Sequence, residues 1–533
     1  MKKLLFLLAI YAFAPGCTKA QNFEEKTNAQ KLLTAYSAIA NLYVDETNST
    51  KITEDAINAM LEKLDPHSSY TNAEETRRMN EPLEANFDGI GIQFNMLTDT
   101  LYVVQVISGG PSEKVGLIAG DRIISVDDTL IAGVKMNNTD VINRIRGKKG
   151  TEVRIKVKRG AAPDLLEFKI IRDVIPVYSM EAAYMADRKT GYLRLNRFAA
   201  SSIEEFEKAF LKLKKEGMEN LILDLQGNGG GYLNTAFILS DEFLGKDKLI
   251  VYTEGNRQPR WDANATENGV FEKGKLIILV DESSASASEI VSGAVQDWDR
   301  GVIVGRRTFG KGLVQRPIVL PDSSMIRLTV ARYYTPSGRN IQRPYEKGNI
   351  EAYNNDIIER YNKGELMYAD SIHFPDSLKY GTLLSKRTVY GGGGIMPDVF
   401  IPVDSSRVTE YHSRLVRYGV MNRMAMSYLD RNRAELTKNY SKIKTYKEKF
   451  AVTDRMLQDL LAMAEEEKIE FNEEQYNKSK ELISLQLKAL IARDLFDMSE
   501  YFQIINEKND SYLEALRIIN DDERYNAILS GGS

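Results

Sequence analysis

The pattern of apolar and polar positions changes repeatedly along the chain. Over residues 22–70, apolar side chains recur at the spacing of amphipathic helices, and the Asp-Pro step at 65–66 ends the second helix. Between residues 87 and 174 the pattern becomes alternating, most strictly at 153–158, where branched apolar residues alternate with basic ones. The pattern therefore predicts helices followed by a small strand-rich module.

Residues 175–402 alternate short apolar strands with helices, which is typical of an α/β sheet covered on its faces. The expected strands are 191–195, 221–225, 276–280, 302–304 and 325–333, and the expected helices are 202–216, 233–244 and 287–298. After residue 404 the chain becomes charged and helical, with apolar stripes at 457–463 and 482–491. We find no candidate catalytic motif in these last helices, and we expect them to pack against the core or a partner subunit.

A chain of 533 residues is too long for one hydrophobic core. The changes of pattern predict a multidomain α/β protein with helical N- and C-terminal segments. The expected parts are a signal peptide at 1–17, a helical segment at 22–85, a strand-rich module at 86–173, an α/β core at 174–404 and a helical region at 405–533.

Composition narrows the function classes. Lys and Arg total 71 against 75 Asp and Glu, so the net charge of -4 gives no reason to expect a nucleic-acid partner. One cysteine and three histidines nearly exclude a zinc site built from Cys and His, and we predict no metal and no cofactor. A Ser-His-Asp triad would have to recruit His67, His373 or His412.

The N-terminus carries Lys2, Lys3 and an apolar run at 4–13, which suits a secretory signal and is too short to span a bilayer. The small residue before Cys17 resembles a bacterial lipoprotein cleavage site, so Cys17 is a candidate for lipidation and membrane attachment. The alternative is an ordinary secretory signal with an incidental cysteine. Both interpretations predict an extracytoplasmic protein, in the periplasm or cell envelope, whose stability does not rest on disulfides.

The most informative segment is SASASE at 284–289, which follows the buried strand at 276–280 and opens a helix. A serine beside the free N–H groups of a helix start is placed to stabilise an alkoxide and an oxyanion. The alternative is that these serines only cap the helix. The glycine-rich loop at 227–231 can point several N–H groups at one anion, but it lacks the GxGxxG pattern of a dinucleotide site.

Lys311 lies in GRRTFGKG at 305–312, one residue short of a phosphate-loop motif. A strand pattern at 313–320 follows where that motif needs a helix, so we reject nucleotide binding. A lysine acting as a base must lower its pKa by roughly 3 units, and burial between glycines can do this. Gln315, on the same strand face, could orient the amine without adding charge.

The motifs at 224–230, 284–290 and 308–312, with those at 64–67, 334–338 and 393–398, together resemble the carboxyl-terminal processing (tail-specific) serine proteases. The resemblance runs from about residue 30 to 403 and departs at a polar insertion, 345–390, which contains His373. It implies a crotonase-like α/β protease core. The implied roles are nucleophile for Ser286, general base for Lys311, lysine-orienting residue for Gln315, and oxyanion hole for the N–H groups of Ala287 and of Gly229 or Gly230.

The module at 86–173 resembles a PDZ domain of the bacterial protease type, on the turn pattern at 110–124. The resemblance implies that the loop formed by Gly89, Ile90, Gly91 and Ile92 binds a peptide's terminal carboxylate. A plain hairpin with turn glycines is the alternative. Arg146 is a candidate for coupling this module to the active site.

The resemblance implies a serine endopeptidase that cleaves extracytoplasmic proteins near their C-termini. Its partners would be proteins or peptides with accessible C-termini, and its C-terminal helices are candidates for forming a homo-oligomer. Two alternatives stay open: a catalytically inactive tail-binding scaffold, and an acyl-CoA enzyme, because the family core resembles the crotonase fold.

Overall fold

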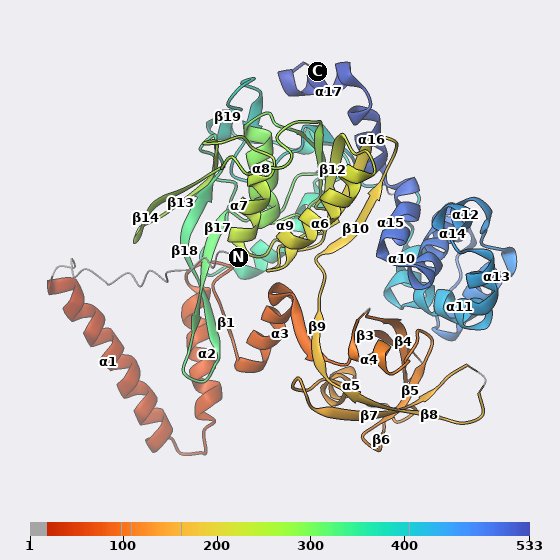
Figure 1. Ribbon diagram of the computed structural model, residues 1–533. Helices are drawn as coiled ribbons and strands as arrows, with labels where there is room; N and C mark the ends of the chain where they lie inside the picture. The colour runs from red at the N-terminus through yellow and green to blue at the C-terminus, as the bar shows by residue number, and fades with distance from the viewer. Residues whose placement is uncertain (1–18, 98, 108, 161, 405, 533) are drawn as a thin grey trace, which may run out of the picture.

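The computed structural model describes residues 19–97, 99–107, 109–160, 162–404 and 406–532. The expected signal peptide, with Cys17, lies outside the described residues. Figure 1 shows helices at the N-terminal end, a separate strand-rich module below the α/β core, and a group of C-terminal helices beside both.

The N-terminal segment contains the expected helices. Its elements are α1 (Lys19–Leu42), α2 (Ser49–Glu62), β1 (Ser69–Thr71) and α3 (Ala73–Glu84). α1 lies away from the rest of the chain in Figure 1, and its apolar side chains, such as Leu32 and Leu33, are exposed. β1 joins a sheet of the core by pairing with β18 (Met325–Tyr334), so this segment contributes a strand to the core.

The strand-rich module is inserted between the N-terminal segment and the α/β core, and its first and last strands lie side by side. Its chain enters by β2 (Asn86–Gly89) and leaves by β9 (Asp173–Pro176), and these two strands pair with each other. Between them lie β3 (Ile92–Leu97), β4 (Thr100–Val106), α4 (Pro111–Lys114), β5 (Arg122–Val126), β6 (Thr129–Leu130), α5 (Asn138–Ile145), β7 (Glu152–Lys158) and β8 (Leu166–Ile171). The module has its own apolar core, which includes the expected inward residues Val153, Ile155 and Val157. In the strand order β3-β4-β5-β7-β8, β3 stands at one edge.

The main sheet has the order β10-β11-β12-β15-β16-β21, and all its neighbours are parallel except β10 and β11. Its elements are β10 (Met180–Met185), β11 (Thr190–Leu195), α6 (Ser202–Lys215), β12 (Asn220–Asp224), α7 (Leu233–Asp241), β15 (Leu276–Val280), α8 (Ala287–Asp297), β16 (Val302–Gly305) and β21 (Val399–Phe400). The expected strands and helices of this part are confirmed. Because β12 and β15 are parallel neighbours, the loops that follow them lie side by side at the carboxyl ends of the strands.

A second sheet has the order β1-β18-β13-β14, and β17 pairs with β18. Its remaining strands are β13 (Leu249–Gly255), β14 (Gln258–Asn264) and β17 (Leu313–Val319). β17 is the strand expected after Lys311. The polar insertion forms α9 (Ile350–Asn362), two short 3-10 helices, β19 (Lys379–Gly381) and β20 (Thr388–Tyr390).

The C-terminal helices divide into two groups. α10 (Glu410–Arg417), α11 (Val420–Asn439), α12 (Ile443–Lys449), α13 (Asp454–Glu466), α14 (Glu473–Leu495) and α15 (Met498–Ile505) share an apolar core of their own. α16 (Asp510–Ile519) and α17 (Asp522–Ser530) instead pack on the face of the main sheet that carries Ile222 and Ile277. α6, α7 and α8 cover the opposite face. The expected stripes at 457–463 and 482–491 lie on α13 and α14 and pack within the separate helical core, while α16 and α17 are the helices that pack on the main sheet.

Candidate active site

Ser286 has an unusual backbone conformation at the start of α8. Its φ of 55° and ψ of -109° lie in a region that residues other than glycine rarely adopt. Ser286 N donates to Glu289 Oε2 at 2.7 Å, and Tyr333 Oη donates to Ser286 O at 3.1 Å. Strain that is held by buried partners is concentrated at functional sites. The geometry therefore favours Ser286 as the reactive serine.

The neighbouring serines have structural contacts instead. Ser284 and Ser288 are fully buried. The Ser284 hydroxyl donates to Leu225 O at 2.7 Å, and the Ser288 hydroxyl donates to Asn228 O at 2.8 Å. Both hold the loop after β12 against the start of α8. The structure thus separates three serines that the sequence pattern alone left equivalent.

The glycine-rich loop lies directly against Ser286. A Cβ added at Gly230, where φ is +103°, would lie 2.9 Å from Ser286 Cβ and 3.1 Å from Ala287 N. A Cβ at Gly229 would meet nothing within 4 Å. Gly230 N already donates to Asn228 Oδ1 at 2.9 Å. Of the candidate oxyanion donors, this arrangement favours the N–H groups of Gly229 and Ala287 over that of Gly230.

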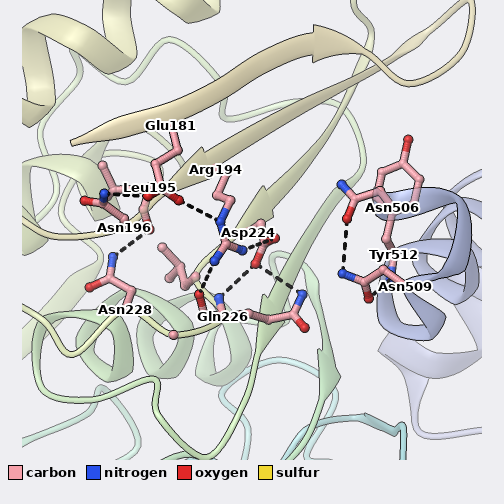
Figure 2. A network of polar contacts seen from close by, with 12 residues as sticks. Glu181, Arg194, Leu195, Asn196, Asp224, Gln226, Asn228, Asn506, Asn509 and Tyr512 are labelled. Carbon is pink, nitrogen blue, oxygen red and sulfur yellow. Dashed lines mark hydrogen bonds and ion pairs between the residues drawn. The ribbon is translucent and has the colours of Figure 1, made fainter. Parts of the chain in front are cut away.

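A buried ion pair supports the turn that leads into this loop (Figure 2). Arg194 Nη1 lies 2.6 Å from Asp224 Oδ2, and Arg194 Nη2 donates to Gln226 O at 2.9 Å. The Arg194 guanidinium also lies 4.6 Å from the ring centre of Phe502 on α15. The C-terminal helices thus reach the base of the glycine-rich loop.

Lys311 is largely buried and held at both its backbone and its amine. Its Nζ donates to Gln315 Oε1 at 3.0 Å, and its backbone N donates to Glu289 Oε2 at 2.9 Å. Burial lowers the pKa of Lys311, and the positive charge of Arg327 lowers that pKa further, while the carboxylates of Glu289 and Asp65 act in the opposite direction. The net shift is toward the neutral amine that a general base requires.

Ser286, Lys311 and Gln315 line one cavity of about 360 Å³, together with Gly229, Gly230 and Arg327. Ala287 is buried next to it. No hydrogen bond between Ser286 Oγ and Lys311 Nζ occurs in the described part of the chain. The cavity brings together the candidate catalytic and loop residues expected from sequence: Ser286 at the N-cap of α8, Lys311 in the loop before β17, Gln315 on β17, and the glycines after β12. Within the described ranges, no group of three or more His, Cys, Asp and Glu side chains could hold a metal ion.

Glu289 is a buried residue of this site that the sequence analysis missed. Its carboxylate accepts from Ser286 N, from Lys311 N, from Thr308 Oγ1 at 2.5 Å and from Gly310 N at 2.7 Å. It therefore connects the backbones of the two candidate catalytic residues. A signal was present, because Glu289 stands three residues after Ser286, which is the spacing of a capping box.

The expected peptide-binding loop lines a second cavity, of about 290 Å³. Gly89, Ile90, Gly91 and Ile92 face Ile142, Ile145 and Arg146 across it. β3, which follows this loop, is an edge strand, and an extended peptide can add to such an edge.

Arg146 connects this cavity with α3. It pairs with Glu81 at 2.5 Å, and its guanidinium lies 4.4 Å from the ring centre of Phe87. Leu83, two residues after Glu81 on the same helix, lines the cavity of Ser286. One helix thus lines the cavity of Ser286 and binds a residue that lines the second cavity.

Four family models match the chain. Peptidase family S41 matches residues 189–351, a PDZ domain matches 89–170, and the N-terminal domain of the activating protease CtpB matches 15–76. A family of unknown function matches residues 411–497, the region of the separate helical core.

Named relatives agree with these models. A carboxy-terminal-processing protease of Bartonella bacilliformis is 35% identical over 354 residues, which cover 64% of this chain and 80% of that protein. The carboxy-terminal processing protease CtpB of Bacillus subtilis is 32% identical over 340 residues, covering 62% and 69%. Among solved structures, the photosystem II D1 C-terminal processing protease matches 58% of this chain and 89% of its own at 28% identity, with a TM-score of 0.33.

Proposed function

The chain belongs to the carboxy-terminal-processing serine proteases of peptidase family S41, with an inserted PDZ domain, and from this premise we propose that it cleaves extracytoplasmic proteins near their C-termini with a Ser286–Lys311 dyad. The predicted family and fold class are confirmed. The observation that carries the dyad is that a strained serine and a lysine with a lowered pKa line the same cavity.

In the proposed reaction, neutral Lys311 accepts the Ser286 hydroxyl proton while Ser286 Oγ attacks the scissile carbonyl. The N–H groups of Gly229 and Ala287 stabilise the oxyanion of the tetrahedral intermediate. The Lys311 ammonium then protonates the leaving amine, and the acyl-enzyme forms. Water, deprotonated by Lys311, hydrolyses the ester and regenerates Ser286. Gln315 fixes the position of the amine through its 3.0 Å contact with Nζ.

The PDZ domain supplies the preference for chain ends. A substrate C-terminus adds to the edge strand β3, and its carboxylate meets the loop of Gly89 to Ile92. The preceding residues of the substrate then run past α3 toward the cavity of Ser286. The contact between Arg146 and Glu81 lies on this route and supports a coupling role for Arg146.

The test uses the purified protein and a substrate with an unstructured C-terminal tail. Ser286→Ala and Lys311→Ala should each abolish cleavage and labelling by a serine-directed fluorophosphonate, because each removes one member of the dyad. Ser283→Ala, at an exposed position in the same turn, is the matched control and should keep full activity. Cleavage that survives both dyad substitutions would overturn the proposal. A wild-type protein that binds tails without cutting them would favour the scaffold alternative.

The location and assembly of the protein are part of the proposal. Within the described residues, no helix has both the length and the apolar composition needed to cross a bilayer. We assign membrane attachment to a lipidated Cys17, because Gly16 precedes it as the small residue of a lipoprotein cleavage site, and Cys17→Ser should release the protein from the membrane fraction. Homo-oligomer formation through the C-terminal helices predicts that removing residues 406–505 lowers the mass measured by light scattering to that of one truncated chain.

A further inference from the structure

Tyr353 links the polar insertion to the residues around Lys311. It lies on α9, and only 5% of its surface is exposed. Its hydroxyl lies 2.8 Å from His67 Nε2, and the two rings meet edge to face at 5.1 Å. Gln342 Nε2 donates to the same hydroxyl at 3.2 Å. A residue of the insertion thus contacts two segments that adjoin Lys311.

The direction of these hydrogen bonds follows from their partners. Gln342 Oε1 accepts from Gly312 N at 2.9 Å, so the amide presents its Nε2 donor to Tyr353. The Tyr353 hydroxyl keeps its own proton for a second bond, and it donates that proton to His67 Nε2 when the neutral imidazole carries its proton on Nδ1. Burial lowers the pKa of His67 to about 4, with a further contribution from the Lys311 charge, which supports the neutral state.

His67 transmits this contact to the lysine. Gln315 Nε2 donates to the backbone carbonyl of His67, and Gln315 Oε1 accepts from Lys311 Nζ at 3.0 Å. The segment that carries the His67 ring therefore sets the orientation of the Gln315 amide. Through Gln342, Tyr353 also holds Gly312, the residue next to Lys311. The Tyr353 hydroxyl therefore supports both the side chain of Lys311, through His67 and Gln315, and the backbone beside Lys311, through Gln342.

Arg343 fixes the position of the tyrosine itself. Its guanidinium lies between two rings, 3.8 Å from the centre of Tyr353 and 4.0 Å from that of Phe309. Arg343 Nη2 donates to Tyr353 O, and Arg343 N donates to Gly310 O, both at 2.9 Å. Tyr353 is thus packed against the loop that contains Lys311 and cannot move independently of it.

We propose that Tyr353 is a positioning residue for the lysine base, acting through His67 and Gln315. The insertion at 345–390 is then part of the catalytic apparatus rather than a surface addition. This inference rests on the proposed Ser286–Lys311 function.

The first test is Tyr353→Phe, which removes the hydroxyl and keeps the ring. We expect kcat to fall about 5-fold with KM unchanged, since the substitution removes the contacts of the hydroxyl with His67 and Gln342, which support the base, and changes no contact with the substrate. Tyr361→Phe, on the exposed face of the same helix, is the matched control and should leave both constants unchanged. A change confined to KM, or no change in kcat, would overturn the inference.

A second test separates positioning from general packing. In a Gln315→Ala background, Tyr353→Phe should cause a smaller loss of kcat than in the wild type, because the path through the Gln315 amide is already gone and only the contact through Gln342 remains. Independent losses that multiply would contradict the inference. His67→Gln keeps an acceptor near the position of Nε2 and should retain more activity than His67→Ala. Equal loss in these two variants, with wild-type unfolding transitions, would also contradict it.

These outcomes are distinguishable from failure of the proposed function. If Lys311→Ala keeps cleaving substrate, the dyad and the inference fall together. If Ser286→Ala and Lys311→Ala both abolish cleavage while Tyr353→Phe keeps the wild-type kcat, only the inference about Tyr353 is wrong. The rate at which a fluorophosphonate at subsaturating concentration labels Ser286 separates the same two outcomes without a protein substrate.

Discussion

The serine side and the lysine side of the active-site cavity are built in different ways. The serine side consists of Ser286 and the glycine-rich loop, which follow two adjacent parallel strands of the main sheet. The lysine side consists of Lys311 and Gln315, which depend on His67 and Tyr353. His67 is 248 residues from Gln315 and 286 residues from Tyr353 in sequence. One side is local to the sheet, and the other is assembled from distant segments.

This difference has a consequence for assembly. The serine side forms when β12 and β15 pair, because its loops are the direct continuations of those strands. The lysine side also requires β1 to pair with β18 and α9 to pack beside it. Closing a longer loop costs more conformational entropy, and each doubling of loop length adds only about 0.6 kcal/mol. The candidate base therefore depends on segments that are more distant in sequence than those that hold the candidate nucleophile.

The largest expected effect is on the serine side. Gly230→Ala places a Cβ 2.9 Å from Ser286 Cβ at a positive φ, so the loop or the serine must shift. A displacement of the reacting groups on this scale lowers kcat by about 100-fold. Gly116→Ala, in the strand-rich module and also at a positive φ, where an added Cβ meets nothing within 4 Å, is the matched control and should lose less than about 3-fold. Equal losses in both variants would mean that the local geometry of the serine side is not decisive.

The next effect concerns the lysine side and its pH dependence. The pKa of His67 is about 4 in the folded protein and about 6.5 in the unfolded chain, so the unfolded state binds more protons between these values. Stability should therefore fall as the pH decreases from 6.5 to 4, by at most about 3 kcal/mol from this residue. Urea unfolding of the wild type and of His67→Gln measures the difference.

His67→Gln should remove that part of the slope. His373→Gln, at an exposed position in the insertion, is the matched control and should keep the wild-type slope. Parallel pH profiles for wild type and His67→Gln would show that the lysine side does not depend on a neutral imidazole.

The same contrast explains what the sequence could predict. The strand at 276–280 is a continuous apolar run, and the one at 221–225 is apolar except for Asp224, because both faces of the main sheet are covered. Their parallel pairing brings the two loops together. The contacts of Tyr353 leave no comparable trace, because a hydrogen bond across 286 residues has no periodicity. β14 was missed for another reason: most of its side chains are exposed, so it carries no hydrophobic pattern.

Glu289 contacts both the serine side and the lysine side of the cavity, so its substitution tests whether the two sides share one support. Glu289→Gln replaces an acceptor of four hydrogen bonds with an amide that turns a donor toward other donors. We expect the free energy of unfolding to fall by about 2 kcal/mol. Glu267→Gln, at an exposed position, is the control and should stay within about 0.5 kcal/mol of the wild type. Wild-type stability of Glu289→Gln would show that the two sides do not share this support.

The smallest effect compares two tyrosines, one on each side of the cavity. Tyr333→Phe removes the 3.1 Å hydrogen bond to Ser286 O, but Glu289 still holds Ser286 N. Because the serine keeps this second support, kcat should fall only about 3-fold, less than with Tyr353→Phe. Tyr334→Phe, whose ring stacks on Tyr252, is the neighbouring control and should have no effect. A loss in Tyr333→Phe larger than that in Tyr353→Phe would reverse the comparison, because the serine side would then be the one that depends on a single remote contact.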